Sequence, residues 1–329
     1  MCKSNQLILL ISSKKNQFHI MSQRIILQHQ SITSKLLILV GLALLSLGIF
    51  SILSIVLASS FYHLPILSNP GILKETSNPN VIPALKMMQV MQALGLFILP
   101  TFVFAKLDSN KLSTYLFLNK KPWLYSLICA VLIMLCAQPL INWMADINGQ
   151  MPAPAWMHES EKEAAAITKI FLDMNNYGDL LVNLFMIALI PAIGEELLFR
   201  GLFQPLFQKL TKNHHLGIWL SAILFSALHM QFLGFFPRMF MGAAFGYLLL
   251  WSGSLWLPII GHFVNNAGAV VIAFMIQKAG MPQELETVGV GEGAILYVLV
   301  STILVGVLLF LVRKNEQGHK QYLSSPLED

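Results

Sequence analysis

The sequence is dominated by repeated apolar runs of roughly twenty residues, the length at which a helix crosses the hydrocarbon core of a bilayer. Charged residues make up only 11% of the chain, whereas a soluble domain carries about 25%. Regular alternation of apolar and polar residues is absent, which disfavours a β-barrel. The sequence therefore predicts an all-α, multi-pass transmembrane helix bundle.

The apolar runs predict about eight spans, and the charges of the loops predict their orientation. Four of the five segments expected inside (1–35, 106–122, 209–215, 252–254 and 313–329) carry Lys or Arg, whereas the loops 145–177 and 279–292 are acidic. This bias places both termini in the cytoplasm. It also explains the net charge of +5 by topology, so no nucleic-acid partner is expected. The predicted spans are 36–62, 87–105, 123–144, 180–209, 216–236, 238–251, 255–277 and 294–312.

Two segments outside the spans have features of their own. Met21 is followed by a sequence that makes a sensible start, so residues 1–20 are interpreted as an over-extended start or a tail. In the acidic loop 145–177, the run 160–163 (Ser-Glu-Lys-Glu) has the pattern of a helix capping box. An apolar stripe follows it at helical spacing and predicts a short amphipathic helix on the membrane surface or over a cavity. The alternative is a solvated linker helix.

The predicted fourth span carries two adjacent carboxylates, Glu195 and Glu196, followed by Arg200. Ionisable groups at membrane depth are costly and tend to be functional. Glu196 and Arg200 are spaced to pair on one helix face, whereas Glu195 points about 100° away and has no local partner. An unpartnered carboxylate suits a general base. The alternative is a purely structural Glu-Arg pair that joins two helices.

Two further polar motifs lie inside predicted spans. His229 follows Phe225 by four residues, and Asn266 follows His262 by four, which places each pair on one helix face. Each histidine alone is equally explained as an interhelical hydrogen-bonding group. Together with the two glutamates, these residues supply a base, hydrogen-bond donors and ligands for a metal. Convergence in one cavity would relieve their burial cost together.

These motifs resemble those of the CPBP family, which comprises the type II CAAX prenyl endopeptidases and the bacterial abortive-infection and bacteriocin-processing proteins. The resemblance covers about residues 178–275, and no single motif carries it alone. The matching patterns, in order along the chain, are Glu195-Glu196-x-x-x-Arg200, Phe225-x-x-x-His229 and His262-x-x-x-Asn266.

The resemblance implies an intramembrane endopeptidase that cleaves near the C-terminus of a membrane-associated or lipidated protein, or cleaves a peptide. Glu195 would be the general base that activates water, and His229 would help to hold that water. His262 and Asn266 would hydrogen-bond the scissile carbonyl and stabilise the oxyanion. The lipid bilayer of the cytoplasmic membrane would be the enzyme's environment.

The resemblance also implies that Glu196 and Arg200 support the helix, and it leaves a metal ion open. Glu195, His229 and His262 are suitable zinc ligands, and three protein ligands plus water is the usual catalytic set. The HExxH pattern, in which two histidines lie one turn apart, is absent from the sequence. We therefore expect catalysis by glutamate and histidine without a structural metal, with a divalent ion such as zinc as the alternative.

These expectations divide the chain into four parts. They are a cytoplasmic tail (1–35), an N-terminal transmembrane region with the acidic loop (36–177), a CPBP-like catalytic core (178–275), and a last span with a second tail (276–329). Two other functions fit the same features. One is a non-catalytic membrane scaffold or bacteriocin immunity protein, and the other is a proton-coupled transporter that uses Glu195 and Glu196.

Overall fold

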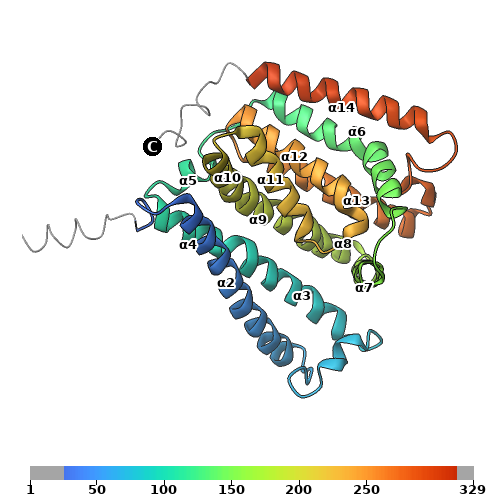
Figure 1. Ribbon diagram of the computed structural model, residues 1–329. Helices are drawn as coiled ribbons and strands as arrows, with labels where there is room; N and C mark the ends of the chain where they lie inside the picture. Colours follow the sequence, from blue (N-terminus) through green and yellow to red (C-terminus); the bar gives the residue numbers. More distant parts are fainter. Residues whose placement is uncertain (1–25, 317–329) are drawn as a thin grey trace, which may run out of the picture.

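The computed structural model describes residues 26–316, and the proposed over-extended start, residues 1–20, lies outside this range. Between these limits all regular secondary structure is helical (Figure 1). The principal helices are α2 (Ile32–Phe61), α3 (Val81–Ala93), α4 (Leu99–Asp108), α5 (Leu112–Tyr115), α6 (Leu124–Gly149), α7 (Ala155–Phe171), α8 (Tyr177–Asn183), α9 (Ile190–Leu198), α10 (Gln204–Thr211), α11 (His214–Ala227), α12 (Phe235–Ser252), α13 (Trp256–Ala279) and α14 (Ala294–Glu316).

Several of these elements are joined by single wide turns, so that they form longer continuous rods. The π-helical segments η2 (Leu94–Ile98), η3 (Leu184–Leu189) and η4 (Phe199–Phe203) connect α3 to α4, α8 to α9, and α9 to α10. Seven helices in the described part of the chain are long and apolar enough to cross a membrane. The prediction of a multi-pass helical membrane protein is therefore confirmed.

One predicted span, 216–236, is wrong, because these residues do not form one continuous helix. Helix α11 ends at Ala227, and the chain then turns through Met230, which has a left-handed backbone (φ 54°). A short 3-10 segment, η5 (Phe232–Gly234), leads into α12. Helix α11 has 14 residues and is shorter than the seven candidate spans. His229 consequently lies in a turn rather than inside a helix.

Local chemistry explains this break, although the segment is apolar throughout. Gly234 caps α12, and Pro237 is tolerated in its first turn because the N–H that proline lacks has no partner there in any case. Asn148 at the end of α6 holds both sides of the turn. Its amide donates to Phe232 O at 3.2 Å, and its carbonyl oxygen accepts from Phe236 N at 2.9 Å.

Two contacts connect the ends of helices at one end of the bundle. Lys35 near the start of α2 forms an ion pair with Asp108 at the end of α4 (2.7 Å), and Asn315 in α14 donates to Ser126 in α6 (3.0 Å). The start of α2 and the end of α14 lie on the same side in Figure 1. The side of the membrane that this end faces stays a prediction from the loop charges.

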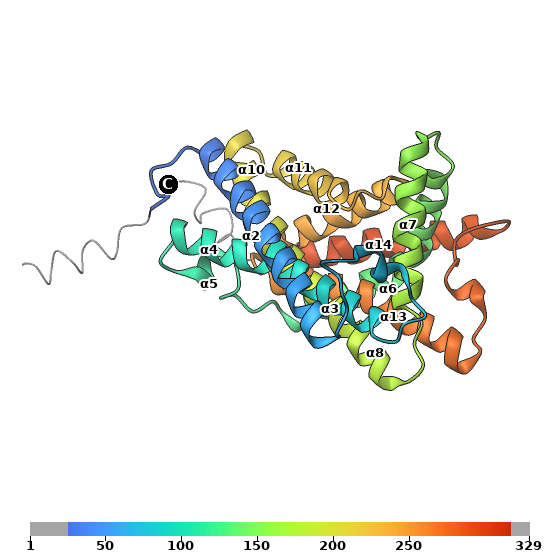
Figure 2. The same cartoon turned by 90° about the horizontal axis from the view of Figure 1, so that it is seen from below.

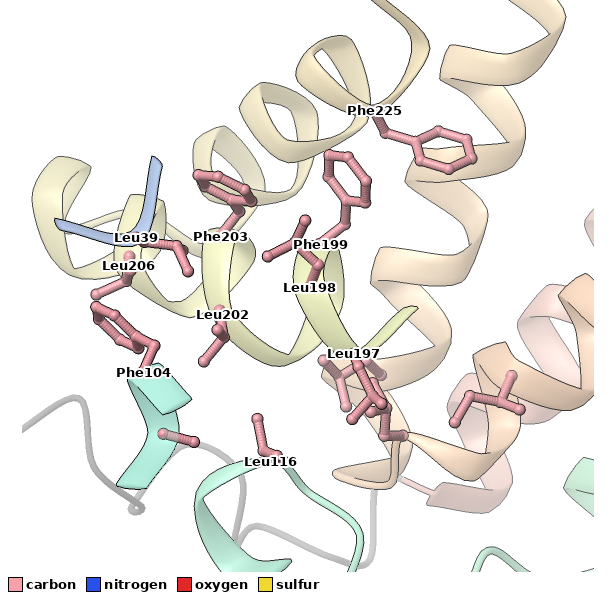
Figure 3. Close-up of a cluster of buried hydrophobic side chains, with 14 of the residues drawn as sticks. Leu39, Phe104, Leu116, Leu197, Leu198, Phe199, Leu202, Phe203, Leu206 and Phe225 are labelled. Atoms are coloured by element: carbon pink, nitrogen blue, oxygen red, sulfur yellow. The ribbon is translucent and has the colours of Figure 1, made fainter. Parts of the chain in front are cut away.

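A hydrophobic core surrounds the helix that carries the two glutamates. Side chains from α9, η4 and α10 point toward α2, α4 and the segment after α5, as Figure 3 shows for Leu202, Leu206, Leu39, Phe104 and Leu116. The turn between α12 and α13 is buried against the same segment, because Leu255 N donates to Phe117 O and Trp256 donates to Leu118 O. This packing holds the glutamate helix from several sides.

The amphipathic helix of the acidic loop is present as α7, but it begins earlier than predicted. Pro154 precedes its first residue, and the structure shows no side-chain cap at this end, so the capping box at 160–163 is wrong. Ser160 instead donates to Met230 O at 3.0 Å. Figure 1 shows α7 end-on while the long helices are seen from the side, so α7 crosses the end of the bundle. Figure 2, turned by 90°, shows it along its length.

The hairpin of α10 and α11 depends on a residue without a side chain. A Cβ at Gly217 would lie 2.7 Å from Gln208 N and 2.8 Å from Gln208 Cα, and the backbone of α10 cannot move away cheaply. We expect Gly217→Ala to lower the free energy of unfolding by about 1–3 kcal/mol, the usual cost of overpacking. The control is Gly268→Ala in α13, where a Cβ meets nothing within 4 Å. Unfolding of both variants in detergent, followed by circular dichroism, measures the difference, and equal stabilities would contradict the prediction.

Candidate active site

The helix that carries the two glutamates is irregular on both sides of them. The π-helical segments η3 and η4 flank α9, which contains Glu195 and Glu196. Pro191 stands four residues after Ile187 and has no N–H, so the Ile187 carbonyl lacks its ordinary helical donor. Single π turns of this kind occur frequently at functional sites. Pro191 leaves the Ile187 carbonyl, eight residues before Glu195, open to a donor from another helix.

Glu196 is fully buried and fixed by two donors. Its Oε1 accepts from Arg200 Nη1 at 2.9 Å and from His262 Nδ1 at 2.8 Å. Arg200 also donates from Nη2 to Gly242 O at 2.9 Å, and a Cβ at Gly242 would lie 3.0 Å from that nitrogen. The Phe225 ring lies 4.6 Å from the guanidinium carbon. The predicted pairing of Glu196 with Arg200 is confirmed, and it joins α9, η4, α12 and α13.

Glu195 has a different environment. It is 8% exposed, and no hydrogen bond to its carboxylate is found among residues 26–316. His262 Nε2 lies 3.7 Å from its Oε2, just beyond hydrogen-bonding distance. Glu196 is therefore held by its two hydrogen-bond donors, whereas Glu195 faces His262 and both of its carboxylate oxygens are available to other groups.

The hydrogen bonds of His262 determine which ring nitrogen carries a proton. Glu196 Oε1 already accepts from Arg200, so it is an acceptor and His262 Nδ1 donates to it. The other nitrogen, Nε2, faces Glu195. The Phe245 ring stacks on the imidazole with centroids 5.3 Å apart, which fixes its plane. Neutral His262 thus presents a lone pair toward Glu195, and protonated His262 presents a donor.

His229 is held in the same way by the end of α11. Its Nδ1 lies 2.8 Å from Phe225 O, and because a carbonyl only accepts, Nδ1 carries the proton. The bond satisfies a carbonyl in the last turn of the helix. The four-residue spacing of Phe225 and His229 therefore lets the imidazole bond the Phe225 carbonyl through Nδ1, and it leaves Nε2 for other partners. The Phe225 ring makes edge-on contacts with both imidazoles, with centroids 4.9 Å from His229 and 6.1 Å from His262.

Asn266 joins α13 to the irregular helix. Its amide nitrogen donates to Ile187 O at 3.0 Å, the carbonyl that Pro191 leaves without a helical donor. Its carbonyl oxygen accepts from Asn265 Nδ2 at 3.1 Å. An asparagine amide has two N–H groups, so one donor remains for another acceptor. The structure thus brings Glu195, Glu196 and His262 into direct proximity and anchors Asn266 to the same helix.

Two polar residues of this network were not predicted as site residues. Gln138 in α6 donates to Asn265 Oδ1 at 3.1 Å, which connects the third predicted span to the site. Arg238 in α12 donates to the side chain and the carbonyl of Gln231, two residues after His229. The available signal was the same for both, namely a strongly polar side chain in an otherwise apolar run.

The residues do not form a ready metal centre. Both histidines donate Nδ1–H to a carboxylate or carbonyl, which is the usual support of a metal-ligating histidine. However, no group of three His, Cys, Asp or Glu side chains in the described residues is placed to hold one ion. The zinc set of Glu195, His229 and His262 is therefore not assembled among the described residues, and a metal ion at these residues stays a prediction.

A separate cavity of about 470 Å3 lies between α3 and the segment α8–η3. Its walls combine apolar residues with Lys86, Asp173 and Asp179. The Asp179 carboxylate already has a structural role, because it forms a capping box with Asn176 at the start of α8. None of the six predicted site residues lines this cavity.

Comparison with known proteins agrees with the resemblance inferred from the motifs. Residues 177–268 match the family model described as type II CAAX prenyl endopeptidase Rce1-like. A protein of Bacillus subtilis (strain 168) named "Uncharacterized protein YpbD" is 25% identical over 147 residues, which cover 44% of this chain. The match spans 64% of that relative, which is less than two thirds of its length. No solved structure matches the chain significantly.

Proposed function

Because residues 177–268 resemble the Rce1-like CAAX endopeptidases, we propose that this multi-pass membrane protein is an intramembrane endopeptidase. Its substrate is a peptide, or a membrane-associated or lipidated protein that is cut near its C-terminus. The observation that carries the proposal is the unequal environment of the two glutamates. Glu196 is locked by Arg200 and His262, whereas Glu195 faces His262 without a hydrogen bond.

Glu195 acts as the general base in this mechanism. Its carboxylate takes a proton from water while the water oxygen attacks the scissile carbonyl carbon, and the carbonyl π electrons move to oxygen. The same proton then passes from Glu195 to the leaving amine nitrogen as the C–N bond breaks. His229 holds the water through the ring nitrogen that the Phe225 carbonyl leaves available.

His262 and Asn266 stabilise the negative oxygen formed by the attack. Asn266 has one N–H left after its bond to Ile187 O. His262 donates from Nε2 only when this nitrogen is protonated, because Nδ1–H is held by Glu196. Glu196 and Arg200 are positioning residues that keep the imidazole in place. We place the enzyme in the cytoplasmic membrane, where its substrate reaches the site from the bilayer or its surface.

A cleavage assay tests this function. Purified full-length protein in proteoliposomes is given a quenched-fluorescent prenylated CAAX peptide and an unprenylated peptide library, each with and without a chelator. We expect cleavage in at least one arm that the chelator does not change. Cleavage lost with chelator and restored by zinc would overturn the metal-free mechanism. Absence of cleavage by the folded protein on every peptide would favour the non-catalytic scaffold.

A further inference from the structure

Arg238, in the first turn of α12, is held by hydrogen bonds beside the turn that follows His229 and has no role in the proposed mechanism. Its Nη1 donates to Gln231 Oε1 at 2.9 Å, and its Nη2 donates to Gln231 O. A Cβ at Gly234 would lie 3.0 Å from Nη1 and 3.2 Å from the guanidinium carbon. The guanidinium therefore packs on the turn that directly follows His229.

The positive charge of Arg238 is not neutralised by an ion pair. Within the described part of the chain no carboxylate lies within 4.0 Å of it, and its buried Nε has no acceptor. Arg238 is partly buried. Arginine stays charged in proteins, and removing a charge from water without a counter-ion is costly. The two hydrogen bonds to Gln231 use neutral acceptors, so they position the group without balancing its charge.

Glu161 is on α7, the helix that is bonded to the same turn through Ser160, and within the described residues it has no ion pair either. Its Oε2 is buried without a donor among residues 26–316. Helix α7 is fixed over the turn by the bond from Ser160 to Met230 O and by an edge-on contact of Trp156 with Phe232, 5.0 Å between centroids. The guanidinium thus lies on the turn that follows His229, and α7, the helix that carries Glu161, is bonded to the same turn.

We infer that Arg238 binds the free C-terminal carboxylate of the substrate and so selects chain ends for cleavage. This inference rests on the proposed function. A carboxylate matches the fork of N–H groups on a guanidinium and would neutralise its charge. Glu161 opposes the bound carboxylate by repulsion, which keeps the affinity moderate and assists release of the C-terminal product. The occupant is thus a peptide that ends in a free carboxyl group.

Two peptides of identical sequence, one with a free C-terminal carboxylate and one with a C-terminal amide, test the inference. With full-length protein in proteoliposomes we expect a lower KM for the acid, giving a kcat/KM ratio of about 10- to 100-fold over the amide, as for a hydrogen bond to a charged group. In Arg238→Gln this ratio falls to about 1. In Glu161→Gln it rises through a further decrease in KM for the acid.

The control variants are Glu159→Gln, on the exposed face of α7, and Arg238→Lys, which keeps the charge but loses the fork and should retain part of the preference. Equal cleavage of acid and amide by the wild type, or an unchanged ratio in folded Arg238→Gln, would overturn the inference and leave the proposed function intact.

If no peptide is cleaved, the proposed function fails. Binding of the labelled acid and amide peptides, measured by fluorescence anisotropy, then decides the role of Arg238. Preference for the acid that Arg238→Gln abolishes supports the role, and equal binding rejects it.

Discussion

Replacing Glu195 by glutamine should lower kcat by a factor of about 10²–10⁴, the usual contribution of a general base. The carboxamide has the same size as the carboxylate but cannot take a proton from water. The fold should be little affected, because the Glu195 carboxylate has no hydrogen bond within residues 26–316. Initial rates on the quenched-fluorescent peptide measure kcat, and thermal unfolding in detergent measures the stability of the fold.

The neighbouring position provides the most informative comparison. Glu196→Gln keeps an oxygen that accepts from Arg200 and His262 but removes the charge that both donors face. We expect this variant to lose stability, whereas Glu195→Gln loses activity. Glu159→Gln on the exposed side of α7 should change neither. If Glu195→Gln retains activity within tenfold of the wild type, Glu195 is not the base.

The parts of the site that follow from helix geometry were predictable from the sequence. A spacing of four residues places Glu196 beside Arg200 on any helix, and the structure contains that pair. The same spacing lets the His229 ring reach the Phe225 carbonyl, although the motif was interpreted as part of a continuous span. These contacts depend only on local backbone geometry. They therefore survive even where the predicted element is wrong.

The break after α11 required information from another helix. Hydropathy counts residues 216–236 as one apolar run, because Phe, Leu and Met are equally apolar in a turn and in a helix. Asn148, at the end of α6, satisfies the open backbone groups on both sides of the turn. The start of α7 differs from the prediction for a simpler reason. Ser160 lies inside the helix and donates to Met230 O, so its side chain does not cap a helix start.

The connections between helices were also beyond local sequence reasoning. The proposal that each histidine satisfies an interhelical bond was treated as an alternative to function, yet His262 lies within reach of both glutamates. Asn265 links Asn266 to Gln138, which is 127 residues away along the chain. Spacing in sequence says which polar groups share a helix face, but not which face of another helix they meet. A structure was needed to join the third predicted span to the site.

Removing Arg200 should produce the largest loss of stability among the residues considered. Arg200→Met leaves the buried Glu196 carboxylate without its cation and the Gly242 carbonyl without its donor. Breaking a buried ion pair by deleting one partner typically costs about 3–5 kcal/mol. We expect a loss of this size in the free energy of unfolding, measured by titration with a denaturing detergent. Arg313→Met, at the exposed end of α14, should stay within about 0.5 kcal/mol of the wild type.

A double-mutant cycle separates the ion pair from the packing around it. In Glu196→Leu/Arg200→Met no buried charge remains unpaired, so the double variant should be less destabilised than the sum of the two single variants. Its activity should nevertheless be low, because His262 Nδ1 has lost its acceptor and the ring is no longer held toward Glu195. Additive losses of stability would show that the two side chains act independently. Full activity in a stable double variant would show that Glu196 does not position His262.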